Sequence, residues 1–135
     1  MIPSVHRWRD DRGAASTQLV LVVPVLLLLA MLIVQFALVW HARHIAQYAA
    51  QRGLAAARTQ HGSAADGRVQ AARSVAALGS RTLTTPSVAV DRTSAQTTVR
   101  VRGTVMTVVP GLHLHASGAA SGPTERLTAP DGGQP

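Results

Sequence analysis

The sequence contains no cysteine and no lysine, and it is poor in aromatic and charged residues. Its 135 residues are 3% aromatic and 14% charged, whereas an average soluble domain is about 25% charged. The absence of cysteine excludes a disulfide scaffold, a thiolate zinc site, an iron–sulfur cluster and a cysteine nucleophile. The chain is nevertheless 47% hydrophobic. Its apolar content therefore resides in aliphatic side chains and alanine.

The sequence also lacks the patterns that catalysis or nucleic-acid binding would need. It has no glycine-rich phosphate loop, no nucleophile elbow, and no adjacent carboxylates beyond Asp10 and Asp11. We therefore expect no enzyme activity, no cofactor and no small-molecule substrate. The formal net charge is +7, but the arginines are dispersed and all four aromatic residues lie in or beside one apolar run. We expect no nucleic-acid partner, and an anionic lipid surface or an acidic partner outside the membrane accounts better for the charge.

The most prominent feature is an apolar run over residues 19–40. These 22 residues contain no charged side chain, and Gln35 is their one strongly polar member. At about 1.5 Å per residue, a helix of this length spans roughly 33 Å, enough for a bilayer core of about 30 Å. Its 16 Leu, Val, Ile and Phe residues favour insertion by roughly 5–10 kcal/mol. The run predicts a transmembrane helix over residues 14–40, with a kink at Pro24. A buried helix of a soluble core is the alternative, although few residues remain to surround it.

Cleavage by an ordinary signal peptidase is not expected after this run. A secretory signal has 7–15 apolar residues and a small-x-small site directly after them, and the sequence offers neither. Three arginines precede the run and three follow it closely, so charge alone does not orient the helix. Gln35 is open to two interpretations: a hydrogen bond to a partner helix, or solvation at the outer edge of the membrane.

An alanine-rich helical region follows over residues 41–79. Small residues recur there at spacings of four and three, which makes a narrow face that another helix could approach closely; they are Ala42, Ala46, Ala49, Gly53 and Ala56. An alanine-rich helix of high intrinsic propensity is the alternative explanation. Gly62 interrupts the pattern, and Ser63 with Asp66 resembles a capping box. Residues up to about Leu78 then form a second helix or continue the first, with Gly79 as a C-terminal cap and an apolar set that includes Val69, Val75 and Leu78.

A small β region occupies residues 80–128, and a disordered tail is expected at residues 129–135. Residues 87–91 predict a short strand, residues 92–96 a turn, and residues 97–108 a strand with Val99 and Val101 on one face and Arg100 on the other. Residues 109–111 predict a turn, and a third strand starts near residue 112. It would place His113 and His115 on one face, but no third ligand has a suitable spacing, so no metal site is expected. The fold class is α+β and membrane-anchored, with a small antiparallel sheet of about three strands.

The order of these segments resembles the TadE-like membrane proteins of tight-adherence (Tad/Flp) pilus systems. The resemblance rests first on residues 12–21 and on the apolar stretch 23–28 that follows them. It also rests on the alanine-rich stretch from residue 42 to residue 58, and on short stretches at residues 99–101, 109–112 and 123–126. It covers roughly residues 12–128. The resemblance implies a pilin-like protein of the plasma membrane, with a cytoplasmic head at residues 1–13 and the C-terminal part outside.

The same resemblance implies processing and partners. A prepilin peptidase would cleave between Gly13 and Ala14, which makes Gln18 the fifth mature residue. That position is usually Glu in the family, where its charge can neutralise the N-terminal ammonium of a neighbouring subunit, whereas Gln can only hydrogen-bond to it. A role in assembling or anchoring a pilus or secretion machine is therefore expected rather than that of a major pilus subunit. The partners would be membrane lipid and other pilus-assembly proteins or TadE-like subunits, reached through helix packing. The alternatives are an unprocessed, membrane-anchored binding module and a small accessory subunit of a larger membrane complex.

Overall fold

The computed structural model describes residues 11–126, with side chains from Gln18 onward. Two helices are followed by three strands: α1 (Asp11–Arg58), α2 (Ala64–Gly79), β1 (Leu83–Arg92), β2 (Gln96–Val105) and β3 (His115–Pro123). The strands form one antiparallel sheet in the order β1-β2-β3. The predicted α+β class is confirmed. The expected head at residues 1–13 lies mostly outside the described residues, and the expected tail at residues 129–135 lies wholly outside them.

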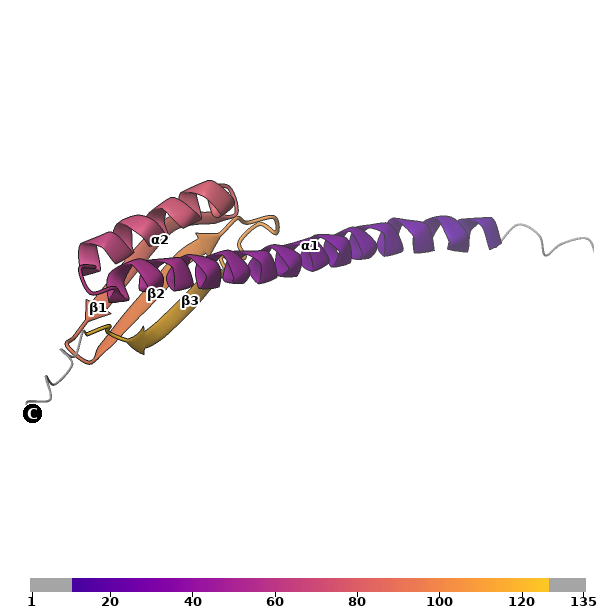
Figure 1. The fold of residues 1–135 in the computed structure, drawn as a ribbon. Coiled ribbons are helices and arrows are strands. Elements are labelled where there is room, and N and C mark those ends of the chain that lie inside the picture. The colour runs from indigo at the N-terminus through magenta and orange to yellow at the C-terminus, as the bar shows by residue number, and fades with distance from the viewer. Residues whose placement is uncertain (1–10, 127–135) are drawn as a thin grey trace, which may run out of the picture.

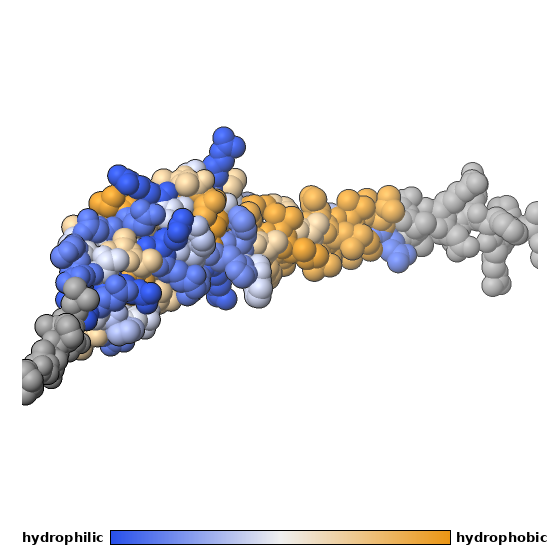
Figure 2. Space-filling view, in the orientation of Figure 1, coloured by the Kyte–Doolittle hydropathy of each residue, from blue (hydrophilic) through white to orange (hydrophobic). Residues whose placement is uncertain are grey.

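Helix α1 has two different halves. Its C-terminal half lies beside α2 over the sheet, while its N-terminal half extends alone, away from the rest of the fold (Figure 1). Every side chain from residue 18 to residue 30 is exposed, and Figure 2 shows this part as an almost continuous apolar surface. Pro24 lies inside the helix, and helical backbone continues on both sides of it. The kink expected at Pro24 stays a prediction.

The alanine-rich region is divided between two helices. Helix α1 continues from the apolar run to Arg58, and α2 begins at Ala64 after a short turn. A capping box starts α2: the Ser63 amide donates to Asp66 Oδ2 over 2.9 Å, and the Asp66 amide donates to Ser63 Oγ over 3.1 Å. Hydrogen bonds from Ser63 to the carboxylate lower the pKa of Asp66 below its ordinary value of 3.8. The predicted capping box is confirmed, and residues 41–79 are two helices.

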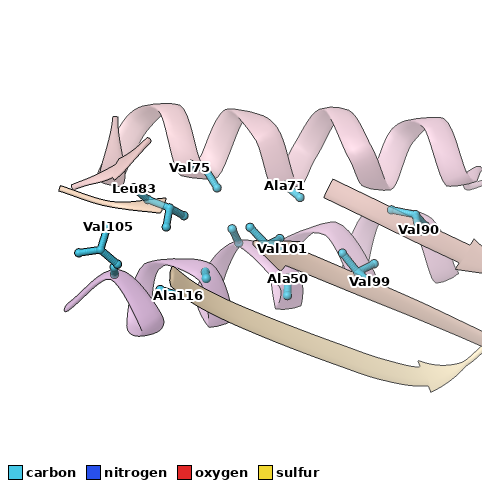
Figure 3. Packing of buried hydrophobic residues seen from close by; sticks show 13 residues of the cluster. Ala50, Ala71, Val75, Leu83, Val90, Val99, Val101, Val105 and Ala116 are labelled. Carbon is cyan, nitrogen blue, oxygen red and sulfur yellow. The ribbon is translucent and has the colours of Figure 1, made fainter. Parts of the chain in front are cut away.

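The two helices meet through small residues rather than through large apolar ones. Ala71 and Val75 of α2 are buried against α1 and the sheet, together with Val99 and Val101 of β2 (Figure 3). A Cβ placed on Gly53 would lie 2.8 Å from the Gly67 carbonyl oxygen of α2. The backbones of α1 and α2 therefore approach more closely than larger side chains would permit.

This close approach corrects two expectations for α2. Val69 and Leu78, expected on the apolar face, are 49% and 55% exposed, whereas Gly67, Ala71, Ser74, Val75 and Gly79 are buried. Gly79 is the last helical residue, and Ser80 is the C-cap. A Cβ on Gly79 would lie 2.8 Å from Ile45 Cγ2. Glycine at this position thus serves close packing on α1, and the expectation that it caps α2 is wrong.

The sheet keeps the predicted alternation but shifts three strand boundaries, and β2 ends at Val105 instead of at residue 108. Val99, Val101 and Val105 are buried, and Arg100 and Arg102 are exposed on the opposite face. Strand β1 begins at Leu83 and contains an irregularity between Thr84 and Ser87. Strand β3 begins at His115, because residues 106–114 form a loop whose turn includes Gly111 at φ 82°. His113 therefore precedes the strand, and the expectation of two histidines on one strand face is wrong.

Candidate functional site: the apolar helix and its junction with the folded part

The apolar part of α1 has the chemistry of a membrane-spanning helix, and most of it is the bare segment (residues 18–34). The most apolar 18-residue window of α1 has a mean hydropathy of 3.0, and 6% of it is buried in the protein. Leu19, Val20 and Leu21 are 66–75% exposed. Burial of this much aliphatic surface in hydrocarbon is strongly favourable. Within the described residues, Gln18–Arg58 is the one helix that is long and apolar enough to cross a membrane.

The sequence positions expected for processing lie at the start of this helix. Gly13 and Ala14 fall within the first turns of α1, before Gln18, where the description of side chains begins. Gln18 is exposed on the bare segment. Processing between Gly13 and Ala14 and the role of Gln18 stay predictions.

The small-residue face of α1 is covered by the same chain. Ala42, Ala46 and Ala49 are fully buried, Gly53 is buried and Ala56 is half-buried. Strand β3 lies so close that a Cβ on Gly118 would lie 2.4 Å from the Ala46 carbonyl carbon. The neighbours of this face within the chain are α2 and the sheet. The expectation that it receives a helix of a partner protein is therefore wrong.

Gln35 joins the bare segment to the folded part. Its side chain is fully buried, whereas its neighbours in the apolar run, Val34 and Phe36, are exposed. Its Nε2 donates to the Met106 carbonyl over 3.2 Å, and its Oε1 accepts from the amides of Val108 and Val109 over 2.7 and 3.3 Å. Both interpretations left open by the sequence, a bond to a partner helix and simple solvation, are wrong. Gln35 holds the β2–β3 loop (residues 106–114) against α1.

Gln47 makes a similar contact three turns further along α1. Its Nε2 donates to the Ala119 carbonyl over 2.9 Å, and its Oε1 accepts from the Ala119 amide over 3.2 Å. Ala119 lies on β3, which has one strand neighbour, β2. Gln47 therefore satisfies backbone groups at an edge of the sheet. A lone polar residue in an apolar run was a sequence signal for Gln35, whereas Gln47 gave none.

The exposed side of α1 beyond the bare segment carries aromatic and cationic side chains. Trp40 and His44 contact edge to face with centroids 5.2 Å apart, and Arg52 lies 5.5 Å from the Tyr48 ring centroid. Trp40 is 68% exposed. Such residues are typical of the membrane interface and the aqueous layer next to it.

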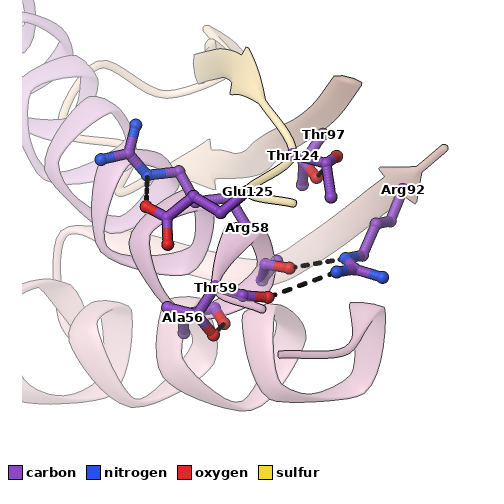
Figure 4. Close-up of polar contacts among 8 residues, drawn as sticks. Ala56, Arg58, Thr59, Arg92, Thr97, Thr124 and Glu125 are labelled. Carbon is purple, nitrogen blue, oxygen red and sulfur yellow. Dashed lines mark hydrogen bonds and ion pairs between the residues drawn. The ribbon is translucent and has the colours of Figure 1, made fainter. Parts of the chain in front are cut away.

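A group of polar contacts lies at the C-terminal end of α1, at the end of the fold away from Gln35 (Figure 4). Arg92 donates from Nε to the Ala57 carbonyl over 2.8 Å and from Nη2 to the Thr59 carbonyl over 3.3 Å. The Glu125 amide donates to the Arg58 carbonyl over 2.9 Å, and the two side chains form an exposed ion pair at 3.8 Å. These contacts satisfy carbonyls at the C-terminus of α1. They have a structural explanation and bring together no reactive group.

The outer face of the sheet is polar and basic. Arg100 and Arg102 project from β2 between small residues of β1 and β3, such as Ala89 and Ser117, which lie opposite them. Arg100 pairs with Asp91 at 3.8 Å, and both side chains are largely exposed. Among residues 18–126, whose side chains the structure describes, no group of three His, Asp or Glu is placed to hold a metal ion.

Taken together, one long apolar helix near the N-terminus and a small α+β fold packed on its second half are consistent with a single-pass membrane protein. A family model described as TadE-like protein matches residues 13–54. The match confirms the resemblance drawn from the sequence, over the bare segment and most of the rest of α1. No curated protein and no solved structure matches the chain.

Proposed function

We propose that the protein is a single-pass, pseudopilin-like membrane protein that takes part in assembling or anchoring a Tad/Flp-type pilus or a related secretion machine. The observation that carries the proposal is the coincidence of the TadE-like match with α1: residues 13–54 include the whole bare segment and all of the small-residue face except Ala56. The N-terminal head would lie in the cytoplasm and the folded part outside the plasma membrane. The role is structural, without catalysis or cofactor.

The bare segment is the surface through which this protein would meet its partners. The small-residue face is covered by α2 and the sheet, so lateral helix packing has to use residues 18–34. Leu26 and Ile33 there are 57% and 63% exposed. Neighbouring helices in a bilayer gain van der Waals packing and hydrogen bonds over such surfaces. Gln18 offers a hydrogen-bonding group without charge at the start of the segment, which suits an assembly or anchoring subunit.

Processing provides the first experiment. The protein is purified from the membrane fraction of its native host, and its intact mass and N-terminal residue are determined. We expect a chain that begins at Ala14. Gly13→Leu should leave the full-length chain, and Val5→Leu, an upstream change within the head, should leave processing unaffected. A wild-type chain that still begins at Met1 or Ile2 would contradict pilin-like maturation and favour a permanent membrane anchor.

Partners are tested by crosslinking in the native membrane. A photoreactive residue at Leu26, in the bare segment, should crosslink to a pilus-assembly membrane protein or to a second copy of this chain. The same residue at Ala65, exposed on α2, is the matched control and should not give that product. Adducts with lipid alone at Leu26 would contradict a role in a protein assembly.

A further inference from the structure

The β2–β3 loop is attached to α1 inside the apolar run rather than beyond it. Gln35, whose side chain bonds the loop backbone at Met106, Val108 and Val109, lies five residues before Trp40, where the run ends. At about 1.5 Å rise per residue, the attachment is about 8 Å closer to the centre of the run than Trp40. Exposed tryptophans of membrane helices lie at the level of the lipid headgroups. The loop is therefore attached deeper than the headgroups, on the hydrocarbon side of them.

The length of the bare segment also indicates that the loop lies at the depth of the hydrocarbon. Residues 19–34 cover about 24 Å as a helix, whereas the hydrocarbon core of a bilayer is about 30 Å thick. A span that begins with the apolar run at Leu19 therefore extends past Gln35. The side of α1 away from the loop stays apolar there, with Phe36 64% exposed. On the near side, the surface at that depth is the β2–β3 loop.

The loop has the composition of a segment that enters lipid. No Asp, Glu, Lys or Arg occurs in residues 103–124. Met106 is 50% exposed, and Pro110 and Gly111 at the turn are exposed. Six of the nine loop residues have apolar side chains: Met106, Val108, Val109, Pro110, Leu112 and Leu114.

Part of the loop backbone is paired within the protein, which favours a low-dielectric environment. The Met106 amide donates to the Thr82 carbonyl over 3.0 Å, and the Leu112 amide donates to the Val109 carbonyl over 3.1 Å. The Leu114 carbonyl accepts from the Val105 amide over 2.8 Å. Together with the three hydrogen bonds that the Gln35 side chain makes to the loop, one donated and two accepted, these contacts reduce the free-energy cost of taking the loop out of water.

The acidic residues lie away from the loop. Beyond the bare segment, the acidic residues that the structure describes are Asp66, Asp91 and Glu125. They lie near the turn after α1, the β1–β2 turn and the end of β3, all at the opposite end from Gln35. Arg81 lies at the loop end, next to Thr82. An arginine at this level faces the anionic headgroups of a bilayer favourably.

We propose that the β2–β3 loop inserts its apolar tip into the bilayer beside α1, with Gln35 as the anchor that holds it there. The folded part then contacts the membrane at two points, the helix and the loop, which fixes its tilt relative to the bilayer. The proposal rests on the membrane span and does not depend on a role in pilus assembly.

The absence of cysteine makes the test direct. Single-cysteine variants of the full chain, Met106→Cys and Pro110→Cys, are labelled with an environment-sensitive fluorophore and reconstituted in vesicles of phosphatidylcholine and phosphatidylglycerol. Quenching by nitroxide-labelled lipid is compared with two references. Phe36→Cys reports the span itself, and Ser94→Cys, in the exposed β1–β2 turn, reports the aqueous end.

We expect the labels at positions 106 and 110 to be quenched by nitroxide lipid nearly as strongly as the label at position 36, at least threefold more than the label at position 94. Quenching equal to that at position 94 overturns the proposal. So does a label that is shielded from aqueous iodide without lipid quenching, because protein would then cover the loop. If position 36 is also unquenched, the span itself fails, and the loop insertion fails with it. Two loop positions keep the test valid should one variant misfold.

Discussion

The side-chain amide of Gln47 makes both hydrogen bonds to Ala119 that the backbone of a neighbouring strand would make, at 2.9 and 3.2 Å. The helix thus supplies a one-residue substitute for a fourth strand. Unpaired strand edges invite pairing with other chains. In this fold, α1 both carries the apolar run and covers part of the edge of β3.

Removing the Gln47 amide should destabilise the fold and expose that edge. We expect Gln47→Ala to lower the free energy of unfolding by about 1–2 kcal/mol, because two backbone groups of Ala119 lose their protein partners. Thermal unfolding of the full chain in detergent micelles measures the change. Gln51→Ala, one turn further along the same helix and likewise exposed, is the matched control and should stay within about 0.5 kcal/mol of wild type. Equal effects of the two substitutions would refute the edge-covering role.

Gln35→Leu should release the β2–β3 loop without unfolding the sheet. The amides of Val108 and Val109 lose their acceptor, so their hydrogen exchange should accelerate at least tenfold. The amide of Val99, in the centre of the sheet, should exchange as in wild type. Residue-resolved hydrogen exchange on the reconstituted protein makes the comparison. Unchanged protection at Val108 and Val109 would show that other contacts hold the loop.

Adding a methyl group should destabilise the fold at one glycine of β3 and have little effect at another. A Cβ on Gly118 would lie 2.3 Å from the Gln47 amide nitrogen, whereas the nearest atom to a Cβ on Gly122 is Leu54 Cδ2 at 3.5 Å. We expect Gly118→Ala to cost about 1–3 kcal/mol or more, since the helix backbone has to move away. Gly122→Ala should be nearly neutral. The two unfolding midpoints, measured in the same micelles, test whether β3 lies against α1 as closely as described.

The capping box at the start of α2 should make stability depend on acid. The pKa of Asp66 is lowered in the folded protein because Ser63 donates hydrogen bonds to its carboxylate. A lowered folded-state pKa means that the contribution of Asp66 is complete above its ordinary value of 3.8 and is lost as the pH falls through the folded-state value. The melting temperature of wild type should therefore exceed that of Asp66→Asn by a constant amount above about pH 5, and the difference should shrink below pH 4.

Ser63→Ala provides the complementary measurement for this capping box. It removes the hydroxyl that contacts the Asp66 carboxylate over 2.6 Å, so the pKa of Asp66 should move back toward its ordinary value. NMR titration of the carboxyl carbon in both proteins measures this shift. An identical titration in wild type and Ser63→Ala would mean that the serine hydroxyl does not stabilise the charged form.

Local sequence patterns predicted a helix or strand well where the residues that determine it are neighbours in the sequence. The uncharged run predicted the helix that stands alone, the alternation of valines predicted the buried face of β2, and Ser63 with Asp66 predicted the start of α2. Each of these signals lies within a few residues of the feature that it determines. The resemblance to the TadE-like family likewise rested on local stretches, and the match over residues 13–54 confirmed it.

Long-range contacts were beyond the reach of such patterns. The partners of Gln35 lie 71–74 residues away, and the partner of Gln47 lies 72 residues away. Large residues of α2 were expected inside, and Val75 is buried there, yet Val69 and Leu78 are exposed. Close to Gly53 the two helices leave room only for small side chains. The small-residue face of α1 correctly indicated close packing, but spacing alone does not distinguish a neighbour in the same chain from one in another protein.

The separation of Gln47 from Ala119 also has a consequence for biosynthesis. A chain made from its N-terminus completes α1 long before β3 exists, because 72 residues separate the two halves of this contact. Until Ala119 emerges, the alanine face of α1 and the valines of β2 have no final cover. Transiently exposed apolar surface of this kind is prone to wrong association. Any truncation before β3 would make that transient state permanent, so nascent chains of this protein should depend on protection until the last strand is released.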